Sequence, residues 1–96
     1  MNDRYLITQA EAEKIIKATF ESLDPPVLRV FPPKEKKKLV VLRVIARQFE
    51  PDRKYGEREV NEILKPIYGD YATLRRSLID YGFMARTLSG TEYWLK

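Results

Sequence analysis

The stretch from Asp70 to Leu95 constrains the fold of this chain more than any other. Asp70 can cap an amphipathic run that ends at Gly82, which predicts a short helix with a glycine stop. Two strand-like runs, FMART and TEYWL, lie on either side of Ser89-Gly90, which predicts a hairpin with a tight turn. A short helix leading directly into a β-hairpin is typical of the second half of a winged-helix domain. In that fold the helix can enter a DNA major groove and the hairpin is the wing.

The N-terminal third predicts a helix followed by a strand. Thr8 and Glu11 have the spacing of a capping box, which marks a helix start. Apolar positions then recur with helical spacing as far as Leu23, and Asp24-Pro25-Pro26 ends the helix because proline has no amide to donate. The β-branched run from Val27 to Phe31 predicts a short strand or an extended crossing.

Residues 34–96 contain the elements of a winged-helix core in order. A helix is predicted from Lys34 to about Phe49, a short strand at 53–55, and a third helix between Gly56 and Pro66. With residues 70–95, the predicted fold is α+β, a winged helix-turn-helix of helix, short strand, helix, helix and β-hairpin wing. Residues 1–33 form an N-terminal helix and strand extension, and residues 1–96 are predicted to be a single domain, because 96 residues suffice for only one.

The helix predicted at 34–49 is apolar on nearly all sides. Its core stripe includes Leu42 and Ile45, but Val40 and Val44 fall on the opposite side. A helix of this kind is buried on more than one face. We therefore expect the first helix to cover the Val40/Val44 face, either from the same chain or from a second chain in a homodimer.

Composition excludes several classes of function. The chain has no Cys and no His, which excludes disulfides, thiolate or imidazole metal sites, Cys nucleophiles and His bases. Every acidic residue has a helix-surface or capping explanation, so we expect no enzymatic activity, no cofactor and no metal. No apolar run approaches the roughly 18 residues of a membrane span, and the N-terminus has no apolar signal core. We expect a cytoplasmic protein without membrane association.

The net charge of +4 is distributed unevenly. Residues 34–56 carry eight basic and three acidic side chains, whereas residues 57–96 carry six of each. A basic patch attracts phosphate groups, and four lysines in the first turn of a helix oppose its dipole, which favours a use other than helix stability. The basic surplus nevertheless lies outside the helix at 70–81, which weakens a DNA-binding interpretation.

The candidate DNA contacts fall into two groups. Arginines can read guanine in the major groove, and lysines can pair with phosphates without reading sequence. For Arg75 and Arg76 the alternative is structural: Arg76 would pair with Asp80 one turn away, and the stem of Arg75 would pack at the edge of the core. The candidates in the helix at 70–81 are Thr73, Arg75, Arg76 and Ser77, and those in the basic block are Lys36, Lys37, Arg53 and Lys54.

Several ordered motifs resemble a prokaryotic family named domain of unknown function 2087. They are FPPKEKKKLVVLRVIARQFEP, KYGEREVNEIL and DYATLRRSLIDYGFMART followed by SGTEYW. The resemblance covers roughly Leu28 to Lys96, with Gly56 in place of the usual Ser or Thr cap. Members occur alone or joined to winged-helix transcriptional regulators, which implies a role near transcription. Locally, the run from Ala72 to Leu78 is similar to the recognition helix of DeoR-type repressors, which implies DNA contact by Thr73, Arg75 and Arg76.

Two functions from different classes follow from these observations. The first is a DNA-binding winged helix that acts in transcriptional regulation on double-stranded DNA, with the helix at 70–81 as the recognition helix. The second is a winged helix that binds no DNA and serves as a protein-interaction or dimerisation module. Convergence of the basic block with Arg76 on one face would favour DNA, and burial of the helix at 70–81 by another helix would favour protein.

Overall fold

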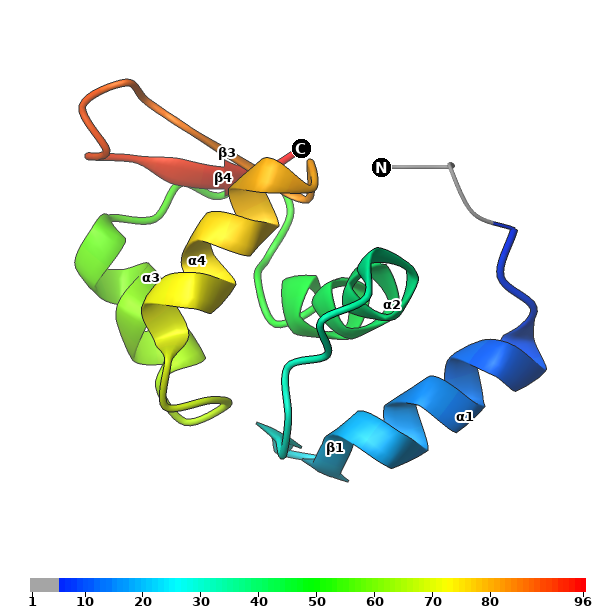
Figure 1. The fold of residues 1–96 in the computed structure, drawn as a ribbon. Helices are drawn as coiled ribbons and strands as arrows, with labels where there is room; N and C mark the ends of the chain where they lie inside the picture. The colour runs from blue at the N-terminus through cyan, green and yellow to red at the C-terminus, as the bar shows by residue number, and fades with distance from the viewer. Residues whose placement is uncertain (1–5) are drawn as a thin grey trace.

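The computed structural model describes residues 6–96, which form four helices and two small antiparallel hairpins (Figure 1). The class is therefore α+β, as predicted. Helices α2, α3 and α4 and the C-terminal hairpin gather on one side, and α1 lies at the opposite edge (Figure 1). The elements in chain order are α1 (Gln9–Thr19), β1 (Phe20–Leu23), β2 (Pro26–Leu28), α2 (Glu35–Ala46), α3 (Glu57–Leu64), α4 (Tyr71–Asp80), β3 (Met84–Arg86) and β4 (Tyr93–Leu95).

Helix α1 begins as predicted and ends earlier than predicted. The Thr8 hydroxyl accepts from the Glu11 amide at 3.1 Å, and the Glu11 carboxylate accepts from the Thr8 amide at 3.3 Å, which completes the capping box. The prediction that the helix extends to Leu23 is wrong, because Phe20–Leu23 is strand β1 and pairs antiparallel with β2. Phe20 satisfies a helical stripe and a strand equally well, and strand pairing places its side chain in the core at 6% exposure.

Helix α2 supplies the centre of the core and is covered on both sides. Leu42 and Ile45 have no exposed surface. The helix ends at Ala46, and a turn replaces the last residues predicted up to Phe49. Val40 is only 7% exposed although it lies outside the main cluster of buried apolar side chains. Because α1 packs against α2 and its Glu11 pairs with Lys36, one turn before Val40, α1 of the same chain lies over this side of the helix. Val44, the other residue of the expected face, is only half-buried and packs against the main core cluster.

One continuous hydrophobic cluster joins the N-terminal extension to the last strand. It contains Phe20 of β1, Leu42 of α2, Leu64 of α3, Leu74 of α4 and Tyr93 of β4. The predicted strand at 53–55 is reduced to a single bridge, in which the amides of Tyr55 and Tyr93 each donate to the other's carbonyl at 2.8 Å. This bridge ties the α2–α3 connection to the C-terminal hairpin.

The segment from α4 through the hairpin follows the sequence closely except at its tip. Gly82 has φ +81°, the left-handed conformation expected of a glycine that ends a helix. The hairpin turns at Ser89-Gly90 as predicted, with Gly90 at φ +74° and its amide donating to the Thr87 carbonyl at 3.0 Å. The loop is longer than a two-residue turn, because the Thr87 amide donates to the Glu92 carbonyl at 3.0 Å and closes it. The hydroxyl of Thr87 accepts from the Thr91 and Glu92 amides at 3.1 and 3.2 Å. These bonds stabilise the wider loop. In the last strand, Tyr93 is buried and Trp94 is half-buried.

Candidate nucleic-acid interface

Helix α4 begins at a carboxylate cap that also engages Thr73. One Asp70 oxygen accepts from the Thr73 amide at 3.3 Å, and the other accepts from the Thr73 hydroxyl at 2.6 Å. These hydrogen bonds, together with the charge of Arg76, lower the pKa of the Asp70 carboxyl. Thr73 is half-buried, and its hydroxyl serves the cap in this conformation.

We expect Asp70→Ala to lower the melting temperature, with a difference that depends on pH. The folded-state pKa of Asp70 is below its ordinary value. The contribution of the Asp70 carboxylate to folding stability is therefore complete above the unfolded-state pKa of about 4. It is lost as pH falls through the lower, folded-state pKa. Thermal unfolding of both proteins at pH 7 and at pH values below about 4 checks this expectation. A melting-temperature difference that is unchanged in acid would contradict it.

The remaining candidates on α4 differ in accessibility. Arg75 is half-buried, and its guanidinium donates to the side-chain oxygen of Asn61 on α3 at 2.5 Å. Ser77 is 8% exposed and lies on the core side of the helix. Arg76 is exposed, and no hydrogen bond or ion pair joins it to another residue within 6–96, including the predicted partner Asp80. The outer face of α4 therefore offers one arginine free to meet a ligand.

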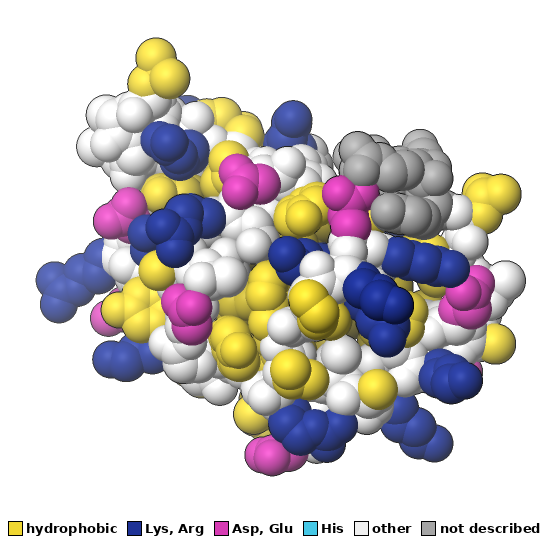
Figure 2. Space-filling view, in the orientation of Figure 1, with side chains coloured by type: hydrophobic (Ala, Val, Ile, Leu, Met, Phe, Trp, Pro, Cys, Tyr) yellow, Lys and Arg dark blue, Asp and Glu magenta, His cyan; other side chains and the backbone are white. Residues whose placement is uncertain are grey.

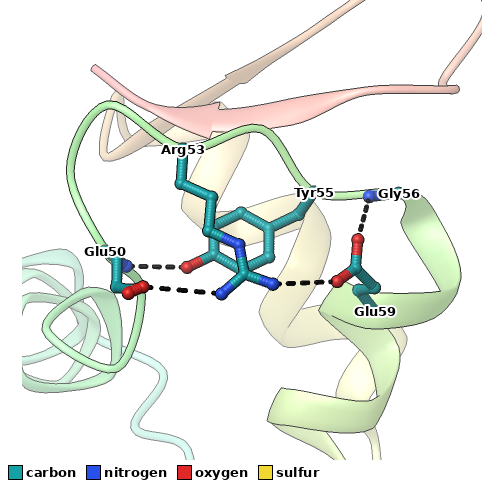
Figure 3. Close-up of polar contacts among 5 residues, drawn as sticks. All are labelled: Glu50, Arg53, Tyr55, Gly56 and Glu59. Carbon is teal, nitrogen blue, oxygen red and sulfur yellow. Dashed lines mark hydrogen bonds and ion pairs between the residues drawn. The ribbon is translucent and has the colours of Figure 1, made fainter.

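Two candidates of the basic block, Arg53 and Lys54, lie in the α2–α3 connection, and Figure 3 shows the contacts of Arg53. The Arg53 guanidinium pairs with Glu50 at 3.5 Å and with Glu59 at 3.1 Å, and it lies 4.5 Å from the centre of the Tyr55 ring. Glu59 in turn accepts from the Gly56 amide at 3.0 Å and caps α3 (Figure 3). The neighbouring Lys54 pairs with Glu92 of the hairpin at 3.8 Å. Within the chain, both cations already face carboxylates.

The first turn of α2 contains the other two candidates of the basic block. Lys36 pairs with Glu11 of α1 at 2.7 Å, and this ammonium and the Thr8 amide lower the pKa of the Glu11 carboxyl. Lys37 is exposed and has no hydrogen bond or ion pair within the described part of the chain. Of the predicted candidates, Arg76 and Lys37 thus have their charge available.

Lys38, which was not among the candidate contacts, lies in the first turn of α2 beside the residue that follows α4. Its ammonium lies 5.5 Å from the ring centre of Phe31 and 6.0 Å from that of Tyr81, the residue directly after α4. The position of Lys38 beside the core stripe could be read from the helical spacing, but its contact with Tyr81 depends on how α2 and α4 pack. Several Lys and Arg side chains border the apolar area in the middle of the face that carries α4 (Figure 2).

Two further observations concern metal sites and membrane-spanning helices within residues 6–96. No group of three acidic side chains there is placed to hold a metal ion. Among the helices of this range, none is long and apolar enough to cross a lipid bilayer.

Comparison with known proteins gives one match. A family model described as "Uncharacterized protein conserved in bacteria (DUF2087)" matches residues 27–95. No curated protein and no solved structure matches the chain. The matched region begins in β2 and includes α2, α3, α4 and the C-terminal hairpin, whereas α1 and β1 lie outside it. Since the match covers well over half of the sequence, the chain belongs to the DUF2087 family.

Proposed function

We propose that this chain is a DNA-binding protein with a winged-helix-like arrangement, in which α4 enters the major groove and the first turn of α2 contacts phosphates. The order of α2, α3, α4, β3 and β4 is compatible with that arrangement. A role in transcriptional regulation would follow from sequence-selective binding.

The observation that carries the proposal is the accessibility of α4. Arg76 is exposed on its outer face, and α1 packs on α2 rather than forming a principal contact with α4. The contact of Lys38 with Tyr81 brings the lysine-rich turn of α2 beside the end of this helix. Arg76 and Lys37 are therefore the first contacts that we assign to DNA. Thr73 and Arg75 would have to exchange their present partners for DNA, and Ser77 is too deeply buried to take part.

A second function has its own support. Lys36, Arg53 and Lys54 are paired with carboxylates of the same chain, and Arg75 is bonded to Asn61. With Thr73, whose hydroxyl donates to Asp70, five of the eight predicted DNA contacts are thus engaged internally. This favours the alternative that the domain is a non-enzymatic module that binds protein and not DNA.

The proposal is tested by titrating a fluorescently labelled DNA duplex with the protein and measuring the fluorescence anisotropy of the duplex. We expect the affinity to fall roughly ten- to hundredfold between about 50 and 200 mM salt, because neutralising two to four phosphates gives a slope of about −0.9 per phosphate. Arg76→Ala should weaken binding about tenfold at low salt, within the range of one good arginine contact.

The matched control for this experiment is Arg47→Ala. It removes the same charge from an exposed position at the other end of α2, about 15 Å along the helix from Lys37. We expect this variant to bind DNA nearly as well as the parent protein. Equal losses in both variants would indicate a response to net charge alone, and an absence of binding at low salt would favour the protein-binding module.

A further inference from the structure

Helix α1 is the least buried helix of the chain and lies outside the region that matches the family. Of its 11 residues only Thr19 is buried. It lies at the edge of the molecule away from α3, α4 and the C-terminal hairpin (Figure 1). One of its sides packs on α2, where Lys36 meets Glu11. The open side of α1, which carries Ala10, Glu13 and Lys17, borders a depression that Leu23 of β1 also lines.

Exposed apolar side chains concentrate around this helix. The large hydrophobic residues that are exposed within 6–96 are Leu6, Leu23, Val30 and Leu88, with exposures of 95, 54, 45 and 103%. Leu6 lies two residues before Thr8, the cap of α1, Leu23 ends β1, and Val30 lies two residues after β2. Leu23 lines the depression beside Ala10, whereas Val30 lines a separate depression beside Ile15, so Leu23 is the exposed large apolar residue that the open side of α1 offers.

The charges on the open side of α1 are arranged so that they complement a second copy of the helix. The Glu13 carboxylate lies in the N-terminal half and accepts from the side-chain Nε2 of Gln9 at 3.3 Å, while Lys17 lies one turn later. Lys14 and Lys17 are exposed and form no ion pair within residues 6–96. If two α1 helices cross antiparallel about a two-fold axis near Ile15, position 13 of one copy lies opposite position 17 of the other. One symmetric contact then forms two Glu13–Lys17 ion pairs.

The same antiparallel alignment places a small side chain of one copy opposite a large side chain of the other. Position 10 of one helix falls opposite position 20 of the other, so the small side chain of Ala10 faces the end of the partner helix that leads into Leu23. The partner's Leu23 could then enter the depression beside Ala10 and lose its exposure to water. An acidic partner would suit this side less well, because it would bring its carboxylates against Glu13.

We infer that the open side of α1 is a homodimer interface, formed by antiparallel packing with a second copy of this chain and specified by two Glu13–Lys17 ion pairs. Eleven residues of helix are only about 16 Å long, so the contact is at the small end of specific interfaces. A dimer of micromolar or weaker affinity is expected. The Val40 face takes no part, because α1 of the same chain covers it.

Sedimentation velocity over a range from about 1 μM to 1 mM protein tests the inference with two charge-reversed variants. Glu13→Lys places four cations across the contact and Lys17→Glu places four anions, so each variant alone should dimerise at least about tenfold more weakly. An equimolar mixture of the two variants should recover the dimer, because each heterodimer then contains two opposite-charge pairs. The double variant Glu13→Lys/Lys17→Glu should also recover it.

The controls are Glu62→Lys and Lys65→Glu, which make the same charge changes at exposed positions at the end of α3. Both should dimerise like the parent protein, and circular dichroism should show that all variants keep their helices. The inference is overturned if the parent protein stays monomeric over the whole range. It is also overturned if the mixture of single variants assembles no better than each variant alone, since that result would exclude the antiparallel pairing.

Discussion

Replacing Tyr55 by alanine is expected to lower the free energy of unfolding by about 3–5 kcal/mol, the cost of removing a large buried aromatic side chain. The ring is 3% exposed and lies edge-to-face against Phe49, with ring centres 5.2 Å apart. Its hydroxyl oxygen accepts from the Glu50 amide at 2.8 Å (Figure 3). In a domain of this size the loss corresponds to a fall in melting temperature of the order of 15–30 °C. Thermal and urea unfolding measure it.

The matched variant Tyr55→Phe separates the ring from the hydroxyl. It keeps the contact with Phe49 and removes only the acceptor for the Glu50 amide, so the expected loss is about 1 kcal/mol. A loss in Tyr55→Ala no larger than that in Tyr55→Phe would contradict the assignment of Tyr55 to the core. It would mean that the backbone bridge between residues 55 and 93 holds this connection without help from the ring.

The features that the sequence predicts well are those encoded by residues close together in the chain. For α4 the cap at Asp70, the spacing of Leu74 and Leu78 and the glycine stop at Gly82 are all local signals, and the helix spans Tyr71–Asp80. The capping box of α1 is equally local. In each case three or four residues contain enough information to position the end of a helix.

The errors arise where distant residues decide between two local possibilities. Phe20 fits the apolar stripe of a helix, and only its pairing with Leu28 makes it part of a strand. Similarly, Lys36 and its partner Glu11 are 25 residues apart, so the spacing of lysines on α2 shows which side chains reach the surface but not which are neutralised there. Ser77 is polar and was expected at the surface, yet its small side chain fits against the core. Which candidate residues are accessible therefore depends on how the helices pack, and the sequence alone does not show it.

Deleting residues 1–24 is the second change with a large expected effect, because it removes the cover from α2. Val40 would become exposed, and the core would lose Phe20, which is 6% exposed in the full chain. Each buried side chain of this kind contributes about 1.5–3 kcal/mol, so we expect the free energy of unfolding to fall by about 3–5 kcal/mol. The uncovered strip should also bind hydrophobic dyes and promote aggregation. A truncated protein as soluble and as heat-stable as the parent would contradict this account.

Val40→Lys distinguishes loss of the cover from general damage, because it should harm the full chain but improve the solubility of the truncated chain at almost no cost in stability. In the full chain, the lysine would be buried under α1, and we expect a destabilisation of at least about 2 kcal/mol. In the truncated chain the same position faces water, so the substitution should change the free energy of unfolding by no more than about 0.5 kcal/mol and should reduce dye binding and aggregation. This difference requires α1 to cover Val40 within one chain. If α1 instead covered only a second chain, diluting the full-length protein until it is monomeric would abolish the cost of Val40→Lys.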